Sequence, residues 1–386
     1  MVLLSYCCLR RKLTLPKRSN FDKYKTHFSF SANKKLRGEV MKIVVLAGGL
    51  SPERDVSLSS GSQIANALRE AGHHVVLLDV YESLRANESE FESLFEDNIT
   101  GKPYYYKVKG TEPDLNEIKR KSNNGDSLIG ENVLSLCLFA DVVFIALHGS
   151  MGENGQIQAT FDVMGIKYTG TGYIGSLLAM DKDLTKKLLQ QAGIPTARWL
   201  TLNKNSISTE YIVNMIGIPC VVKPCSAGSS IGVSIVYNIE ELETAITVAN
   251  KIEFSLLIEK MIVGREFSVG LLQGKALPVI EIIPKEGFYD YKNKYQAGLT
   301  RDICPANLSE YDTKRVQSLA LRICEILRLG TYSRIDFILN ERDEFICLEA
   351  NTLPGMTPTS LIPQEALANG ISYIELCNII VNARTK

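Results

Sequence analysis

Three runs of apolar residues dominate the first ordered part of the chain, at residues 42–47, 74–79 and 141–147. Each run is nearly continuous rather than alternating, which is typical of strands that are buried on both faces of a parallel sheet. Residues 57–70 lie between the first two runs and are predicted to form a helix that ends at Gly72. Strands that alternate with a helix in this way predict an open α/β sheet.

A smaller unit is predicted in the middle of the chain. A helix at residues 184–191 is followed by apolar runs at residues 219–223 and 256–259, which predict strands. Between these strands, residues 240–251 have helical spacing, and Asn238 stands where a helix cap is expected. This mixture of short strands and helices predicts an α+β unit.

The last third of the chain is predicted to form a second α+β unit. Residues 267–272 and 276–283 are apolar runs that predict strands, and residues 309–329 have apolar spacing near 3.6. Two further apolar runs, at residues 334–339 and from Phe345 onward, are separated by a polar turn and predict an antiparallel hairpin. We expect the helix to pack beside this hairpin.

Two segments show no clear periodicity. Residues 1–40 hold ten Lys and Arg against Asp22 and Glu39, and their apolar start precedes the basic cluster, which is the reverse of a secretory signal. They are interpreted as a disordered extension or a start codon upstream of Met41, with an organelle transit peptide as the alternative. Residues 84–135 are charged and weakly periodic, and are predicted to be surface without assigned chemistry.

The composition indicates a soluble protein of more than one domain. The 386 residues are 45% hydrophobic and 22% charged, and 43 Lys and Arg balance 43 Asp and Glu. That balance argues against nucleic acid or an acidic membrane surface as a partner. No apolar run approaches the ~20 residues needed to span a bilayer. Nine cysteines without CxxC pairs predict reduced thiols and a cytoplasmic location.

Polar residues interrupt the predicted hairpin where a purely structural strand would carry Val or Ile. Glu349 and Asn351 are two residues apart and therefore share a face, and Asp336 can join them from the partner strand. Two carboxylates and an amide oxygen form a hard oxygen site suited to Mg²⁺ beside nucleotide phosphates. The alternative is a solvent-exposed outer face of the sheet.

Two polar sites follow predicted strands of the N-terminal sheet. Residues 48–57 form a strand-to-helix turn that favours anions and can hold Glu53 toward a ligand, and Asp55 can serve as a helix cap instead. The turn lacks the third glycine of a dinucleotide fingerprint. His148 directly follows the third strand, at the edge where open α/β sheets bind ligands, although a lone histidine is also common as a structural residue.

A lysine at a strand end begins the sequence Lys-Pro-Cys-Ser-Ala-Gly-Ser-Ser-Ile-Gly at residues 223–232. Small residues expose backbone N–H groups to phosphate oxygens, and Lys223 supplies a charge. The lysine precedes the glycines, so this is not a Walker A loop. A flexible surface hairpin is the alternative.

Read in order, the segments AGGLSPERDVS, ALHGSMGENG, MDK, VVKPCSAGSSIGVS, IEKMIVGREFSV, FYDYKNKY, RIDF and LEANTLPGMTPTS resemble the D-alanine:D-alanine ligases of the ATP-grasp superfamily. The resemblance runs from Met41 to near the C-terminus. It implies an α/β fold, in which an N-terminal open parallel α/β domain at residues 41–179 binds substrate. It also implies a two-lobed α+β ATP-grasp fold, with a central lobe at residues 180–265 and a C-terminal lobe at residues 266–386.

The resemblance also implies an ATP site between the two lobes. Lys182 and Lys223 would contact phosphates, and Lys294 would reach the transferred phosphoryl group from a mobile loop. Two Mg²⁺ ions, with Mn²⁺ as an alternative, would be held by Asp336, Glu349 and Asn351. The other implied nucleotide contacts are Ser230 in the phosphate loop, Glu259, Lys260 and Ile262 near adenine, Glu266 at the ribose, and Phe288, Ile338 and Leu348 around the base.

The implied reaction joins two D-alanines through an acyl phosphate, with no protein nucleophile. Arg334 and the N–H of Gly355 would stabilise the oxyanion. The other implied catalytic or substrate contacts are Glu53 with Ser229 and Tyr295 at the first ammonium group, Ser360 at the second carboxylate, and His148 and Leu361 in the substrate site.

The function implied is ATP-dependent synthesis of D-alanyl-D-alanine for peptidoglycan precursors, and the family resemblance also implies a homodimer. Tyr295 favours D-alanine as the second substrate, because relatives that make D-alanyl-D-lactate usually carry another residue there. A D-alanyl-D-lactate or D-alanyl-D-serine ligase on the same scaffold is the nearest alternative. A nucleotide-binding module without catalysis, or a dinucleotide-binding protein, is the alternative of a different class.

Overall fold

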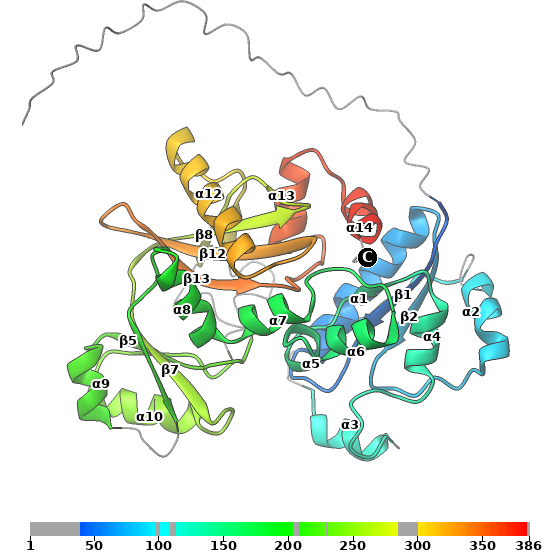
Figure 1. Cartoon of the computed structure of the whole chain (residues 1–386), viewed down its shortest axis with the longest axis horizontal. Helices are drawn as coiled ribbons and strands as arrows, with labels where there is room; N and C mark the ends of the chain where they lie inside the picture. The colour runs from blue at the N-terminus through cyan, green and yellow to red at the C-terminus, as the bar shows by residue number, and fades with distance from the viewer. Residues whose placement is uncertain are drawn as a thin grey trace, which may run out of the picture. The chain divides into compact units, whose positions relative to one another are not determined.

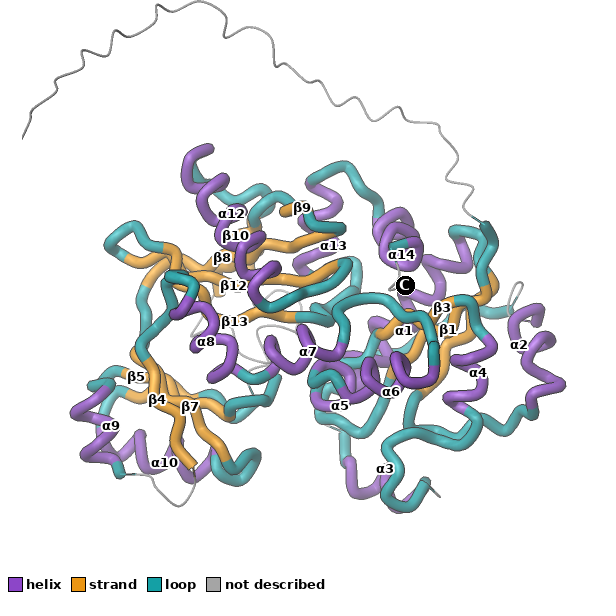
Figure 2. The backbone as a smooth tube through the Cα atoms, in the orientation of Figure 1, coloured by secondary structure: helices purple, strands orange, loops and turns teal. Residues whose placement is uncertain are grey.

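The computed structural model describes residues 39–97, 101–108, 113–122, 124–203, 208–228, 231–284 and 300–383 (Figure 1). The expectations for residues 1–38 lie outside this range. Three sheets organise the described part of the chain, one parallel and two antiparallel (Figure 2). The predicted fold class, an α/β sheet followed by two α+β units, is confirmed. Across the described residues, no helix has both the length and the apolarity needed to cross a bilayer.

The N-terminal sheet has the order β2-β1-β3, and all its strands run parallel. Its strands are β1 Lys42–Ala47, β2 His74–Asp79 and β3 Val142–Ile145. The first two match the predicted bounds, because both faces are covered and the apolar run is therefore as long as the strand. Helix α1 Arg54–Glu70 joins β1 to β2 and begins three residues earlier than predicted.

The start of α1 corrects the proposed capping role of Asp55. Glu53 occupies the N-cap position without a side-chain cap bond, and Asp55 lies inside the first helical turn. The Asp55 carboxylate accepts a hydrogen bond from the Tyr106 hydroxyl at 2.8 Å. It therefore ties a distant segment to the helix rather than capping it.

Residues 84–135 are not only elaborated surface, and that interpretation is wrong in part. Phe91, Phe95, Val133 and Leu136 are all at most 1% exposed and belong to the same core as the N-terminal sheet. The segment was hard to interpret because each of its helices is too short to establish a clear 3.6-residue period. They are the 3-10 helix η1 Glu88–Glu90 and the α-helices α2 Phe91–Asp97, α3 Leu115–Lys121 and α4 Val133–Phe139.

The chain then passes along four helices into the central sheet, whose order is β4-β7-β5-β6 with antiparallel pairing. The expected cap is present, because the Asn238 side chain accepts a hydrogen bond from Glu241 N at 2.8 Å. The helices are α5 Ser150–Glu153, α6 Gln156–Met164, α7 Tyr173–Met180 and α8 Lys182–Gln191. The central unit contains β4 Trp199–Asn203, α9 Thr209–Met215, β5 Cys220–Pro224, β6 Ser234–Val236, α10 Ile239–Ala249 and β7 Ser255–Lys260.

The third sheet has the order β11-β10-β8-β12-β13. The predicted strand at residues 276–283 is divided in two, and the break contains Pro278, which has no N–H to donate. Helix α12 packs on β8 and β12, as expected. The elements are β8 Gly264–Leu272, β9 Lys275–Ala276, β10 Ile280–Pro284, β11 Thr300–Ile303, α12 Glu310–Ile326, β12 Tyr332–Asn340 and β13 Phe345–Asn351.

Two C-terminal helices that the sequence did not predict complete the described fold, α13 Leu361–Ala368 and α14 Tyr373–Asn382. Helix α14 packs against α1, and His73 Nε2 lies 2.9 Å from Asn378 Oδ1 in a buried hydrogen bond. The end of the chain is thereby fastened to the N-terminal unit. Ser360 is the N-cap of helix α13, which brings the N-terminus of this helix to the site described next.

Candidate active site

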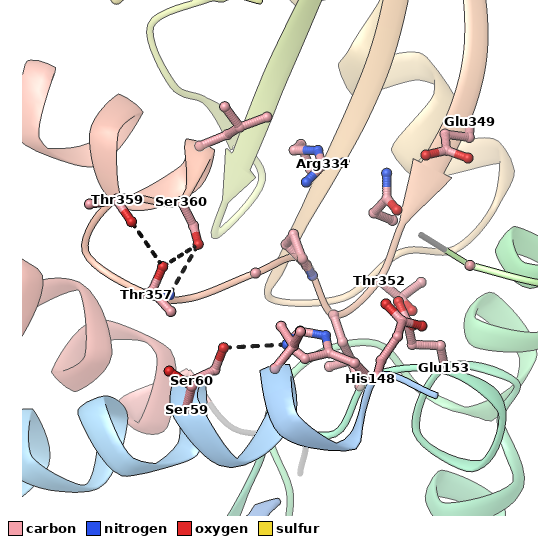
Figure 3. Close-up of a pocket in the computed structure, with 18 of the residues that line it drawn as sticks. Ser59, Ser60, His148, Glu153, Arg334, Glu349, Thr352, Thr357, Thr359 and Ser360 are labelled. Atoms are coloured by element: carbon pink, nitrogen blue, oxygen red, sulfur yellow. Dashed lines mark hydrogen bonds between the residues drawn. The ribbon is translucent and has the colours of Figure 1, made fainter. Parts of the chain in front are cut away.

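A cavity of about 710 Å³ lies where the N-terminal unit meets the β12–β13 hairpin and the start of α13 (Figure 3). It is lined by side chains from α1, from the residues after β3 and from the C-terminal end of β13. Predicted site residues that line it are Glu53, His148, Lys182, Arg334, Glu349, Asn351, Gly355, Ser360 and Leu361. Residues far apart in the sequence are therefore brought together around one cavity.

His148 lies at the carboxyl end of the third parallel strand and is 7% exposed. Its Nε2 is 3.5 Å from the Ser60 hydroxyl on α1, and its carbonyl accepts a hydrogen bond from Ser51 at 2.9 Å (Figure 3). Burial lowers the pKa of His148, although nearby Glu53 acts in the opposite direction. The imidazole is therefore neutral near pH 7, and it contributes a hydrogen-bonding group to the cavity rather than a charge.

Glu153 was missed by the sequence analysis, although it lines the cavity beside His148 (Figure 3). Its carboxylate accepts a hydrogen bond from Gly149 N at 2.7 Å. Burial, and after it the negative charge of Glu53, raise the pKa of Glu153 from 4.5 to about 8. The four-residue spacing from Gly149 was visible in the sequence, but the proximity to Glu53 depends on the tertiary fold. Two carboxyl groups thus face one end of the cavity, which suits an ammonium group.

The raised pKa of Glu153 predicts a pH-dependent cost to stability. Between pH 4.5 and about 8 the folded chain holds a proton that the unfolded chain releases, so the free energy of unfolding falls as the pH rises through this window. Replacement of Glu153 by Gln removes this cost. We expect similar stability at pH 5 and a gain of at least about 1 kcal/mol at pH 8, measured by chemical denaturation.

The control for this measurement is Asp126→Asn, because the Asp126 side chain is fully exposed in the fold. It should leave the pH dependence of unfolding unchanged. An equal pH slope in Glu153→Gln and in the unmodified chain would contradict the protonated state that we assign to Glu153.

On the other wall, Arg334 and Asp336 form a two-bonded ion pair. Arg334 Nε donates to Asp336 Oδ1 at 2.9 Å, and its terminal nitrogen donates to Oδ2 at 2.7 Å. Asp336 lies opposite Glu349 in the register of β12 and β13, and Arg334 lies opposite Asn351. Asn351 Nδ2 is 3.0 Å from Asp336 Oδ2. The predicted convergence of these polar residues on one face of the hairpin is therefore confirmed.

The residues present fit a hard divalent cation. Asp336 and Asn351 are close enough for both to contact one ion, and Glu349 is brought to the same place by its register with Asp336. Asp336 is 5% exposed, which excludes the solvated outer face that was the alternative. Carboxylate and amide oxygens in this arrangement are the donor set that Mg²⁺ prefers.

The N-terminus of α13 forms part of the cavity lining. Ser360 occupies the N-cap position, and its hydroxyl accepts a hydrogen bond from Thr357 N at 3.1 Å (Figure 3). Thr357 Oγ1 is a further 2.8 Å contact of the same hydroxyl. The free N–H groups and the dipole of a helix N-terminus favour an anion, so this end suits a carboxylate. Gly355 precedes this turn and also lines the cavity.

Two lysines that were predicted to contact phosphates have different surroundings. Lys182 lines the cavity and donates to the Ala227 carbonyl at 2.7 Å, and burial lowers its pKa. Lys223 is not among the residues that line the cavity, and it pairs with Glu259 at 2.6 Å. Burial opposes the charge of Lys223, but Glu259 outweighs it and raises the pKa of the lysine. Both amines are on the central unit, on α8 and β5.

The remaining nucleotide residues are only partly described. Glu266 lies opposite Ile338 in the register of β8 and β12, so these two share a face. Leu348 lies at the bulge of β13, and Lys260 ends β7, two residues before Ile262. The structure does not describe five predicted site residues, which are Ser229, Ser230, Phe288, Lys294 and Tyr295.

The segment at residues 101–108 supplies an unexpected wall of the cavity. The Asn66 side chain on α1 donates to the Tyr104 carbonyl at 2.8 Å and accepts from Tyr104 N at 2.9 Å, and the Tyr106 hydroxyl donates to Asp55. These contacts bring Val108 to the cavity lining, near Gln63. No periodic signal in the sequence could have placed this segment, because it is held by side chains rather than by a regular element.

Comparisons with known proteins agree with the resemblance. Residues 42–171 match the family model "D-ala D-ala ligase N-terminus", and residues 188–382 match "D-ala D-ala ligase C-terminus". A D-alanine--D-alanine ligase of Pediococcus pentosaceus is 41% identical over 90% of this chain and 98% of its own. That of Aquifex aeolicus is 37% identical over 88% of this chain and its full length.

Solved structures give the same result. The crystal structure of D-alanine--D-alanine ligase from Bacillus anthracis has a TM-score of 0.68 at 30% identity, covering 89% of this chain and 97% of its own. A structure of that enzyme complexed with ATP has a TM-score of 0.67 at 29% identity, covering 90% of this chain and 97% of its own.

Proposed function

Because this chain belongs to the D-alanine--D-alanine ligase family, we propose that the cavity between Glu53 and Ser360 is where it joins its two substrates. The chain is an ATP-dependent ligase that makes D-alanyl-D-alanine for cell-wall precursors. One observation carries the assignment of the cavity. Its lining contains the carboxyl groups of Glu53 and Glu153 together with the Arg334 guanidinium and the N-terminus of α13. D-alanine has the complementary ammonium and carboxylate groups.

Glu53 binds the ammonium group of the first D-alanine in this proposal. The carboxyl groups of Glu53 and Glu153 both approach Gly228, where an added Cβ would be 3.1 Å from Glu53 Oε2 and 3.8 Å from Glu153 Oε2. This supports a common site for the ammonium group, since the two carboxyl groups face the same small volume, with the charge supplied by Glu53 and the protonated Glu153 as its neighbour. Ser229 and Tyr295 complete the site by resemblance to the family, and they lie outside the described residues.

The reaction begins with attack of the first D-alanine carboxylate on the γ-phosphorus of ATP, which releases ADP and gives an acyl phosphate. The amino group of the second D-alanine then attacks the acyl carbon, and phosphate leaves. Arg334 and the N–H of Gly355 stabilise the negative oxygen of the tetrahedral state, as a guanidinium and an aimed amide can. Ser360 and the α13 N-terminus hold the second carboxylate, and Leu361 and His148 border the same substrate.

ATP is held by the central unit in this proposal. Lys182 and Lys223 are placed on elements that flank the cavity, and Lys294 and Ser230 join them by resemblance. Side chains and backbone groups at Glu259, Lys260, Ile262, Glu266, Phe288, Ile338 and Leu348 form the adenosine site. The side chain of Glu259 is engaged by lysines, so only its backbone is available to adenine.

Asp336, Glu349 and Asn351 would hold two Mg²⁺ ions, or Mn²⁺ as an alternative. A bound divalent cation would neutralise phosphate charge and so favour phosphoryl transfer. The chain's own contribution is to hold three oxygen donors on two paired strands in a buried setting, where charge interactions are stronger than in water.

The division into residues 41–179, 180–265 and 266–386 is proposed as three folding units, because each contains its own sheet. We also propose a homodimer and a cytoplasmic location. The family resemblance supports the first. The second is supported by seven free cysteines in the described residues, five of which are buried.

A panel of D-amino acids in a phosphate-release assay tests the substrate proposal. ATP turnover should depend on D-alanine, should be absent with L-alanine, and should give D-alanyl-D-alanine by mass. D-lactate and D-serine are offered as competing second substrates at equal concentration. Turnover that is indifferent to D-alanine, or a predominant ester product, would contradict the assignment.

A further inference from the structure

The Asp336 carboxylate is saturated by donors from the protein itself. Its Oδ1 accepts hydrogen bonds from the Ser268 hydroxyl at 2.7 Å and from Arg334 Nε at 2.9 Å. Its Oδ2 accepts from the second Arg334 nitrogen at 2.7 Å and from Asn351 Nδ2 at 3.0 Å. A carboxylate offers about four lone-pair positions, so a cation can bind Asp336 only by displacing one of these donors.

These four hydrogen bonds come from three side chains, which differ in how easily they can leave Asp336. Ser268 is 0% exposed, lies opposite Asp336 in the register of β8 and β12, and has a short side chain on a paired strand. Arg334 has a long side chain that lines the cavity, where the substrate offers it another partner. Asn351 can turn its amide so that the oxygen replaces the nitrogen. The serine is therefore the donor that stays.

We propose that Ser268 is a positioning residue for Asp336, and that Arg334 and a divalent cation occupy the Asp336 carboxylate in turn, each excluding the other. This inference rests on the proposed function, because it takes the metal site to be that of Asp336, Glu349 and Asn351. Ser268 fixes the carboxylate through Oδ1 and leaves Oδ2 for the cation. Loading of the cation then releases the Arg334 guanidinium toward the reacting carbonyl.

The arrangement gives the ion pair a role before the reaction. Without a cation, the two-bonded pair keeps Asp336 from being a buried charge without a partner, which would be costly. With a cation, the same guanidinium is free to stabilise a developing oxyanion. The arginine is thus held away from the substrate until the metal is present.

Binding of Mn²⁺ to the full chain tests the role of Ser268. Binding is measured as the loss of the electron paramagnetic resonance signal of the free ion, with and without ADP. Replacement of a group that holds a metal ligand typically lowers metal affinity 10- to 100-fold. We expect Ser268→Ala to weaken Mn²⁺ binding about tenfold, while Ser268→Thr, which keeps the hydroxyl, stays within about twofold of the unmodified chain.

Ser333→Ala is the matched control. Ser333 is also 0% exposed and lies on β12 next to Arg334, but its side chain points to the opposite face, toward Cys324. It should leave Mn²⁺ binding unchanged. If Ser268→Ala and Ser333→Ala bind Mn²⁺ equally well, Ser268 has no positioning role and the inference fails.

Arg334→Lys tests the exclusion between arginine and cation. Lysine keeps the positive charge but cannot make the two parallel bonds to Asp336, so competition for the carboxylate predicts several-fold tighter Mn²⁺ binding. If the arginine acted only by charge repulsion, Mn²⁺ affinity would not change in Arg334→Lys. That result would contradict the proposal that Arg334 and the cation exclude each other from Asp336. Glu349→Gln separates this failure from failure of the proposed function. If Glu349→Gln binds Mn²⁺ normally, the metal site itself is misplaced.

Discussion

Arg334→Ala should lower the rate of D-alanyl-D-alanine synthesis about 100- to 1000-fold while ATP still binds. Removal of one preorganised oxyanion donor typically costs about 3–4 kcal/mol of transition-state stabilisation. Arg334 lines the cavity, and its side chain is 11% exposed, so water cannot fully replace it. The measurement is the steady-state rate of phosphate release at saturating D-alanine, with nucleotide binding followed separately by calorimetry.

The matched control is Arg322→Ala. Arg322 lies on α12 and donates to the Ala192 carbonyl at 3.1 Å, an exposed contact outside the cavity. It should retain the full synthetic rate. Synthesis by Arg334→Ala within about fivefold of the unmodified chain would show that another group stabilises the oxyanion, and the catalytic assignment of Arg334 would be wrong.

The parts of the fold that were predicted from the sequence are those with a strong local signal. Strands β1 and β2 were predicted with their observed bounds, because strands buried on both faces are continuous apolar runs. The hairpin residues Glu349 and Asn351 were predicted to share a face from their spacing alone. Asp336 was expected to join them from the partner strand, and it does so because a register shift between Asp336 and Phe337 pairs it with Glu349 rather than with Leu348.

The parts that were missed depend on contacts between distant segments. Ser268 reaches Asp336 only because β8 pairs with β12, a pairing across about seventy residues that no local pattern specifies. Val108 reaches the cavity because two tyrosines of an irregular segment bind α1. Glu153 was missed for a related reason, because its importance comes from the neighbouring charge of Glu53.

The second large effect is expected at Glu259, which lies between two buried lysines. Its carboxylate pairs with Lys223 at 2.6 Å and with Lys186 at 2.7 Å, and the three side chains are 2–9% exposed. Replacement of Glu259 by Leu leaves two buried ammonium groups without this partner. Breaking a buried ion pair by removing one member typically costs about 3–5 kcal/mol, so we expect a loss of that size in the free energy of unfolding.

Glu281→Gln is the matched control, because Glu281 is also buried and pairs with Arg265 at 2.7 Å, but Arg265 is 47% exposed. Water can replace the carboxylate partner of such an exposed side chain. The loss in the free energy of unfolding should therefore be about 1 kcal/mol or less. Equal losses in the two variants would show that burial of the lysines does not decide the effect.

The pH dependence of unfolding distinguishes the charge of Glu259 from its packing. Burial opposes ionisation of this carboxyl group, but Lys223 and Lys186 outweigh it and lower its pKa from 4.5 to about 2. The stabilisation is therefore present above pH 4.5 and is lost as the pH falls toward 2. Glu259→Gln keeps the shape without the charge, so its stability should be below that of the unmodified chain at pH 7, and the difference should shrink as the pH falls through this window. If the difference in stability between Glu259→Gln and the unmodified chain stayed constant between pH 5 and pH 2.5, packing and not the paired charge would hold Lys223 in place.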